Sequence, residues 1–95
     1  MQTIWITGGS SGIGFAVAQK FLDENWRVVI SSRNENKLLK AVEKLKNLTN
    51  KKEIYFKICD VSKYTDVKNT IAYIENEISE INIALLNATA YSPNR

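Results

Sequence analysis

The glycine-rich turn after the first apolar run constrains the fold of this chain more than any other feature. The run Thr3–Thr7 is short, β-branched and aromatic, which predicts a buried strand. It is followed by glycines at 8, 9, 12 and 14, and apolar residues then recur at helical spacing over 13–24. At such a junction the unpaired N–H groups and the partial positive charge of a helix N-terminus face the turn. The sequence therefore predicts a phosphate-binding turn.

The glycines and serines of this turn have separate expected roles. Gly8 would allow the sharp turn, Gly12 the close approach of the backbone to a ligand, and Gly14 the packing of helix on strand. Ser10 and Ser11 would add hydroxyl donors beside the phosphates. A glycine-rich turn that binds no ligand is the simpler alternative.

A P-loop does not fit the same residues. Gly9 and Gly14 have the separation of its two glycines, but Phe15 and Ala16 follow. A P-loop needs a Lys for the β- and γ-phosphates and a Ser or Thr for magnesium at those two positions.

The rest of the chain alternates strands and helices. Further strands are predicted over 27–31, 53–58 and 82–87, with helices between them that are capped by Asn34 and Ser62. The apolar residues expected on the buried faces of the three helices are Ile13, Ala16, Val17, Phe21, Leu22, Leu38, Ala41, Val42, Leu45, Leu48, Val67, Ile71, Ile74 and Ile78. No hairpin turn joins the third and fourth strands, so the pattern favours parallel βαβ units.

Composition excludes several classes of protein. With 95 residues, 44% hydrophobic and 24% charged, the chain fits one small globular domain. Its single cysteine, Cys59, allows no intramolecular disulfide and is expected to be a small buried residue. Histidine is absent and no metal-ligand cluster is present. No signal-peptide pattern or apolar run of about 18 residues occurs, so we expect a cytoplasmic protein without a membrane partner.

The positive charge is mild. Thirteen Lys and Arg against ten Asp and Glu give +3, and the basic residues are densest over 37–52. A solvated helix face explains this better than a nucleic-acid site, since no aromatic interleaving or binding motif accompanies it.

Taken together, the motifs resemble those of the short-chain dehydrogenase/reductase family. The family's glycine pattern is Thr-Gly, three residues and then Gly-x-Gly. It is matched by Thr7-Gly8 and, three residues later, Gly12-Ile13-Gly14. Three segments follow in the family's order: Ser31-Ser32-Arg33, Cys59-Asp60-Val61 and Leu86-Asn87-Ala88-Thr89. The cofactor-binding residues that the resemblance implies are Gly8, Ser10, Ser11, Gly12, Ile13, Gly14, Ser32, Arg33, Asp60, Val61, Asn87 and Ala88.

Two of these segments have other interpretations. Asp60 resembles the family's adenine-contacting Asp, but it could simply cap the following helix. Asn87 could be an ordinary polar residue that closes a strand. In the last segment Leu86 replaces an Asn of the family, and Thr89 replaces a Gly and would bring a side chain beside the cofactor ribose.

The end of the second strand predicts NADP(H) rather than NAD(H). An acidic residue there would bind the 2′-hydroxyl of NAD, but Ser32 and Arg33 occupy this position and the first carboxylate is Glu35. A guanidinium grips a phosphate through paired donors. The alternative is that Arg33 is only a surface residue at a helix entrance.

No catalytic residue is assigned. The resemblance implies a catalytic Ser, Tyr and Lys after the fourth strand, so residues 1–95 are expected to be an NAD(P)-binding half-domain truncated before them. Tyr64 and Lys68 have the family's Tyr–Lys spacing, but they precede the fourth strand and are not expected to be catalytic.

The resemblance also implies the architecture: a partial, doubly wound Rossmann-like parallel sheet of about four strands in the order 3-2-1-4, with three helices. The apolar fourth strand would then be an edge that invites self-association or a homo-oligomer. We expect the NADP(H)-binding part of an enzyme that interconverts an alcohol and a carbonyl by hydride transfer, whose small-molecule substrate binds only in the full-length parent. The alternative is a non-catalytic NADP(H)-binding sensor or interaction module, or a gene remnant.

Overall fold

The chain forms a parallel α/β sheet with helices on both faces. The computed structural model describes residues 1–10 and 12–87. Its elements in chain order are β1 (Thr3–Thr7), α1 (Gly12–Asp23), β2 (Arg27–Ser32), α2 (Glu35–Thr49), β3 (Ile54–Ile58), α3 (Tyr64–Glu77) and β4 (Ile83–Leu86). All strand pairs are parallel and the order is β3-β2-β1-β4. The predicted Rossmann-like fold and strand order are confirmed.

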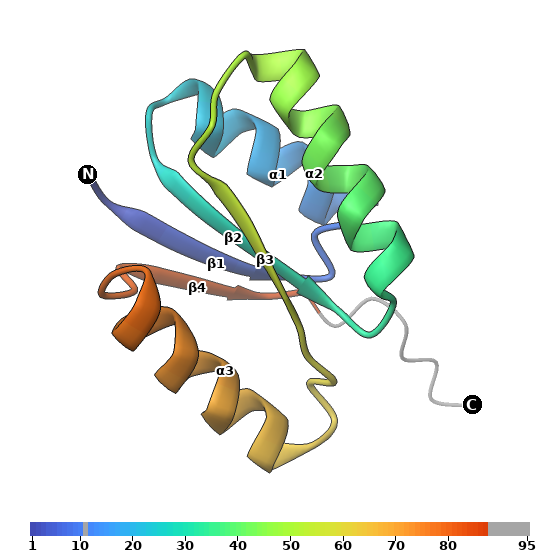
Figure 1. Cartoon of the computed structure of the whole chain (residues 1–95), viewed down its shortest axis with the longest axis vertical. Coiled ribbons are helices and arrows are strands. Elements are labelled where there is room, and N and C mark those ends of the chain that lie inside the picture. The colour runs from blue at the N-terminus through green and yellow to red at the C-terminus, as the bar shows by residue number, and fades with distance from the viewer. Residues whose placement is uncertain (11, 88–95) are drawn as a thin grey trace.

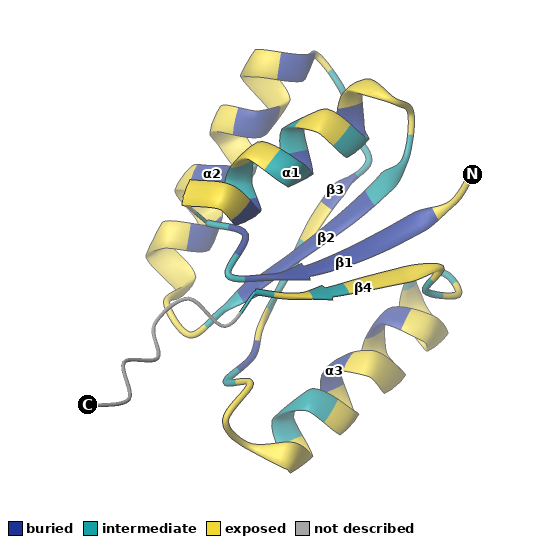
Figure 2. Ribbon diagram, turned by 180° about the vertical axis from the view of Figure 1, so that it is seen from behind, coloured by how far each residue is buried: buried dark blue, intermediate teal, exposed yellow. Residues whose placement is uncertain are grey.

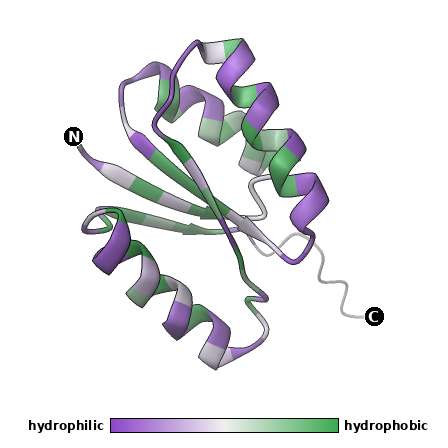
Figure 3. Cartoon of the chain, viewed as in Figure 1, coloured by the Kyte–Doolittle hydropathy of each residue, from purple (hydrophilic) through white to green (hydrophobic). Residues whose placement is uncertain are grey.

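The sheet separates two hydrophobic clusters (Figure 1). Helices α1 and α2 cover one face, where Ile4 and Ile6 of β1 are buried, and α3 covers the other, where Trp5 is buried. Successive side chains of a strand point to opposite faces, so β1 serves both clusters. Figure 2 shows β1 and β2 as the buried centre, and Figure 3 shows hydrophobic residues along the strands with hydrophilic residues on the outer sides of α2 and α3.

A buried hydrogen bond and a buried thiol lie on the α3 face. The indole N–H of Trp5 donates to the Ser31 hydroxyl at 2.9 Å. Cys59 is 2% exposed and packs in the same cluster, as predicted for a small apolar residue.

One predicted helix cap is confirmed and the other is wrong. The Asn34 side chain accepts a hydrogen bond from the backbone N–H of Lys37 at 3.0 Å. The residue that caps α3 is Lys63, without a side-chain hydrogen bond. Ser62 does not cap α3, because it lies one residue before the cap position; its backbone N–H and its hydroxyl both donate to Asp60, at 3.0 and 2.7 Å.

The predicted apolar helix faces are only partly buried. Ile13 is 71% exposed and Leu48 53%, and Ile71 and Ala16 are exposed as well. In α1 the buried residues are Gly14, Ala18 and Leu22. Because consecutive helical residues are rotated by about 100°, packing Gly14 against the turn leaves Ile13 facing outward.

The strand β4 is an edge of the sheet and pairs with β1. Two of its apolar residues, Ile83 and Leu86, are 42% and 62% exposed. Within residues 1–10 and 12–87, no helix has the length and hydropathy needed to span a membrane.

Candidate functional site

The sheet register brings the predicted site segments to one edge. Thr7 pairs with Ser31 on one side and with Leu86 on the other, and Ser32 pairs with Ile58. The glycine turn, the β2–α2 turn, the β3–α3 loop and Asn87 therefore all follow the carboxyl ends of strands. The strand order also reverses between β1 and β4, which is where ligands of open α/β sheets bind.

The glycine turn lies between β1 and the N-terminus of α1 (Figure 1). Gly8 and Gly12 have φ of +71° and +61°, a left-handed conformation that favours glycine. The backbone N–H of Gly8 donates to the Ser31 carbonyl at 2.7 Å, which extends the β1–β2 ladder into the turn. A Cβ added at Gly12 would meet nothing within 4 Å, so this side of the turn is open to a ligand.

Gly14 has a packing role, as the sequence predicted. A Cβ added there would lie 2.9 Å from the carbonyl carbon of Gly8 and 3.0 Å from the Cα of Gly9, with the Gly8 oxygen closer still. The start of α1 thus rests directly on the backbone of the turn.

Asn87 joins the end of β4 to the same turn. Its backbone N–H donates to the Thr7 hydroxyl at 2.9 Å, and its carbonyl oxygen would lie 3.0 Å from a Cβ added at Gly8. Its side-chain nitrogen Nδ2 is buried and finds no hydrogen-bond partner among the described residues. An unpaired buried donor costs about 1–3 kcal/mol. A ligand acceptor beside Gly8 would remove this cost.

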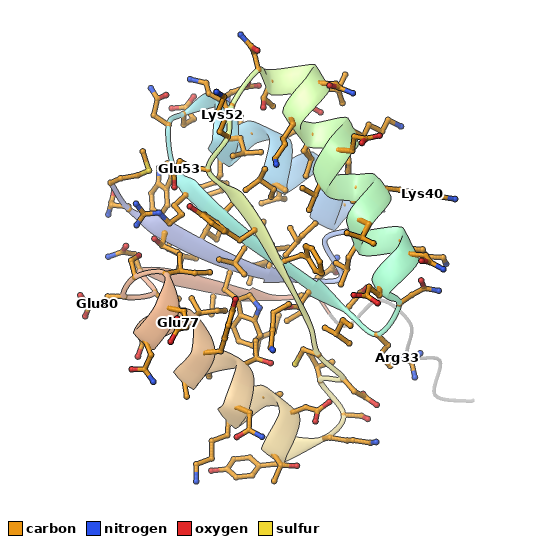
Figure 4. The ribbon with its side chains drawn as sticks, in the orientation of Figure 1. Arg33, Lys40, Lys52, Glu53, Glu77 and Glu80 are labelled. Atoms are coloured by element: carbon orange, nitrogen blue, oxygen red, sulfur yellow. The ribbon has the colours of Figure 1, made fainter. Side chains whose placement is uncertain are left out.

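The β2–α2 turn and the β3–α3 loop form the other side of the site. Arg33 is exposed on the β2–α2 turn (Figure 4), and the Ser32 hydroxyl bonds to the backbone of Asn34. Hydrogen bonds from Ser62 hold the pKa of the Asp60 carboxyl below its usual range, and the positive charge of Arg33 contributes in the same direction. Asp60 therefore stays ionised, and its carboxylate orders the loop rather than the first turn of α3.

The structure brings together most of the predicted binding residues. Gly8, Ser10, Gly12, Ile13 and Gly14 form the turn and the start of α1. Val61 is exposed next to Asp60. Ser11, Ala88 and Thr89 lie outside the described residues.

A cationic groove next to the turn was missed by the sequence reasoning. This lysine groove, a cavity of about 510 Å³ between α1 and α2, is lined by Ser10, Gly12, Phe15, Lys37, Lys40, Ala41 and Lys44. The i, i+3, i+7 spacing of the three lysines was a readable sign that they share one helix face. All three lysines are exposed, as predicted for a solvated helix face, and the structure adds that they lie beside Ser10 and Gly12.

Two other site types receive no support from the geometry. Tyr64 is the first residue of α3 and precedes the fourth strand, as predicted, and its side chain is exposed. Within the described part of the chain, no group of three or more His, Cys, Asp or Glu could hold a metal ion.

Known proteins resemble this chain in sequence and in fold. A family profile described as short chain dehydrogenase matches residues 2–95. Chlorophyll(ide) b reductase NOL of Arabidopsis thaliana, a chloroplastic protein, is 37% identical over 91 residues, which cover 94% of this chain and 26% of that protein. The (+)-neomenthol dehydrogenase of the same plant is 31% identical over 85 residues, covering 87% and 29%.

Solved structures agree with the fold. L-Sorbose reductase from Gluconobacter frateurii, complexed with NADPH and L-sorbose, has a TM-score of 0.87 and 26% identity, over 99% of this chain and 35% of that one. An actinorhodin polyketide ketoreductase with NADPH has a TM-score of 0.88 at 23% identity, over 96% and 34%. The chain thus spans about a quarter to a third of the proteins it matches.

Proposed function

The chain belongs to the short chain dehydrogenase family, and from this membership we propose that it binds NADP(H) for an oxidoreductase that interconverts an alcohol and a carbonyl. The observation that supports this most directly is the glycine turn at the strand-order reversal. There one side of Gly12, the first residue of α1, is open, and the Asn87 Nδ2, which has no partner among the described residues, lies beside Gly8. Bound there, the nicotinamide would donate or accept a hydride.

We expect each predicted segment to bind a different part of the dinucleotide. The turn over 8–14 would bind the pyrophosphate through its backbone N–H groups. Asp60 and Val61 would contact the adenine, Ser32 and Arg33 the 2′-phosphate, and Asn87 with Ala88 the ribose on the nicotinamide side. These contacts would require no rearrangement of the sheet, because the strand register already brings the ends of β1, β2 and β4 to one edge.

The preference for the phosphorylated cofactor rests on the end of β2. Ser31 and Ser32 supply no carboxylate to repel a 2′-phosphate, and Arg33 is free to reach one because no described residue forms an ion pair with it. Calorimetric titration with NADPH and NADH tests both parts of the proposal. The folded chain is expected to bind both dinucleotides, NADPH more tightly.

Arg33→Ala isolates the phosphate contact. A charge-assisted hydrogen bond contributes about 1.5–3 kcal/mol, so NADPH affinity should fall at least tenfold while NADH affinity stays constant. Lys52→Ala is the matched control, because Lys52 lies at the opposite end of β3 from this site (Figure 4). Equal losses for both dinucleotides in Arg33→Ala would remove the 2′-phosphate argument, and a folded chain that binds neither would refute the proposed function.

We also propose that the catalytic Ser, Tyr and Lys belong to a segment beyond residue 95. The chain covers 26% of the chlorophyll(ide) b reductase relative, so most of a family member is not represented in it. The downstream coding sequence tests this. A Tyr and a Lys four residues apart, about 60 residues beyond Asn87 with a Ser upstream, would support the enzyme. A stop codon in their place would favour the non-catalytic binding module.

The exposed edge strand favours self-association of the chain. Leu86 and Ile83 are exposed on β4, and an apolar sheet edge with unpaired backbone groups can pair with another chain. Light scattering across a wide concentration range should show association that Leu86→Lys reduces. Leu48→Lys, which places the same charge on an exposed position of α2, should not. A parent chain that is monomeric throughout would contradict this proposal.

A further inference from the structure

The lysine groove has the size and the charge of a small-molecule site. Its volume of about 510 Å³ falls within the range of about 300–1,000 Å³ of ligand pockets. Phe15 and Ala41 give it an apolar wall, and none of the described residues that line it is acidic. It opens beside the glycine turn, since Ser10 and Gly12 line it too.

No carboxylate among the described residues forms an ion pair with the three ammonium groups of the groove. The ion pairs formed among residues 1–10 and 12–87 are Lys20–Glu24 and Arg27–Glu53, neither of which involves a groove lysine. The Nζ of Lys44 lies 5.5 Å from the centre of the Phe15 ring, a cation–π contact that holds it at the wall of the groove. Like charges three and four residues apart on a helix repel one another. A bound anion would relieve this repulsion.

The spacing of the lysines selects the kind of anion. Lys37 and Lys44 are seven residues apart, which is about 10 Å along the axis of α2. A single phosphate group could contact Lys37 and Lys44 together only if both side chains bent toward one another, whereas a chain of phosphates running along the helix can contact all three lysines in extended conformations.

This groove differs from the predicted 2′-phosphate contact. Arg33 does not line it, and the charge of Arg33 acts instead on Asp60 of the β3–α3 loop. The groove nevertheless shares Ser10 and Gly12 with the turn that would hold the dinucleotide pyrophosphate. Two anionic ligands cannot use these residues at once.

We propose that the lysine groove is a second anion site, which binds the triphosphate chain of a nucleoside triphosphate or of inorganic tripolyphosphate, and that its occupancy excludes the dinucleotide. The exclusion rests on the proposed function, but binding in the groove does not. Each can therefore fail separately.

Calorimetric titration of the 95-residue chain with inorganic tripolyphosphate, at low ionic strength and without metal ions, tests the site. The double variant Lys37→Gln/Lys40→Gln should bind about tenfold more weakly, and Lys44→Gln, which changes a single position, about threefold. Lys46→Gln is the matched control, because it removes the same charge from α2 outside the groove and should change affinity less than twofold. No binding by the parent chain, or an equal loss in Lys46→Gln, would overturn the site.

A second titration separates the two ligands. ATP that binds more tightly than tripolyphosphate identifies a nucleotide as the ligand, and equal affinities identify the phosphate chain alone. Arg33→Ala should leave tripolyphosphate affinity unchanged, and a large loss would mean that the anion occupies the cofactor's phosphate contact instead. Rising tripolyphosphate should weaken NADPH binding, and simultaneous binding of both would overturn the exclusion. A chain that binds tripolyphosphate but neither NADPH nor NADH would refute the proposed function but not the anion site in the lysine groove.

Discussion

Replacing Gly14 by Ala tests whether the start of α1 rests on the glycine turn. The added methyl group would lie 2.9 Å from the carbonyl carbon of Gly8 and 3.0 Å from the Cα of Gly9. Carbon atoms normally approach no closer than about 3.5 Å, so the helix and turn must separate by at least about 0.5 Å. Both contacts are with backbone, and no rotamer change can relieve them.

The expected cost follows from two opposing effects. Overpacking by one carbon costs about 1–3 kcal/mol, and the upper end applies where backbone must move. Alanine is favoured over glycine inside a helix by about 1 kcal/mol. The net loss is therefore about 2 kcal/mol, from the total of about 5–14 kcal/mol expected for a domain of this size.

Urea unfolding followed by tryptophan fluorescence measures this loss, because the indole of Trp5 is buried in the sheet. The midpoint should fall by about 1–2 M urea for Gly14→Ala. Gly12→Ala is the control: its methyl group meets nothing within 4 Å, but φ is +61°, so a loss of about 1 kcal/mol is expected from backbone conformation alone. A Gly14→Ala variant within about 0.5 kcal/mol of the parent would refute the packing argument.

Three further predictions concern stability. Asn34→Ala removes the side-chain acceptor at the N-terminus of α2 and should lower the free energy of unfolding by about 1 kcal/mol in the same urea assay. Ser31→Ala leaves the buried indole N–H of Trp5 without its partner and should cost about 1–3 kcal/mol, with a change in tryptophan emission; a neutral result would show that the N–H finds another acceptor. The hydrogen bond from Arg27 holds the pKa of Glu53 below its usual range, so the stability from this pair is present above the unfolded pKa of about 4.3 and is lost as pH falls through the lower, folded pKa. Because Glu53 is more than a third exposed, the effect is below about 1 kcal/mol, and thermal melts between pH 5 and pH 3 should show a smaller fall for Glu53→Gln than for the parent.

Local sequence determined the elements and indicated the candidate site. Alternating β-branched runs and helical periodicity were enough to predict the strands and helices, since both are short-range patterns. The helix cap at Asn34 could be predicted from the chemistry of its side chain, and the packing role of Gly14 from its lack of one. The cap predicted at Ser62 was wrong because α3 begins one residue later than expected, with Lys63 at the cap position, a boundary that local composition does not reveal.

Other features depended on how the helices are rotated against the sheet. Ile13 has an apolar side chain at helical spacing, yet it is 71% exposed because Gly14 must face the turn. The lysines of α2 are exposed, as the sequence predicted, and only the packing of α1 against α2 brings Phe15 beside them.

The sequence by itself determined an α/β chain with a glycine-rich turn between the first strand and the first helix, and the chemical types of the residues around that turn. Only the tertiary structure decided that Asn87 brings to Gly8 a side-chain Nδ2 without a partner among the described residues, and that three lysines share a groove with Ser10. The physical reason is distance along the chain. Asn87 and Gly8 meet through parallel pairing of β1 with β4, and α1 meets α2 through packing on one face of the sheet, and neither contact leaves a local pattern in the residues that make it.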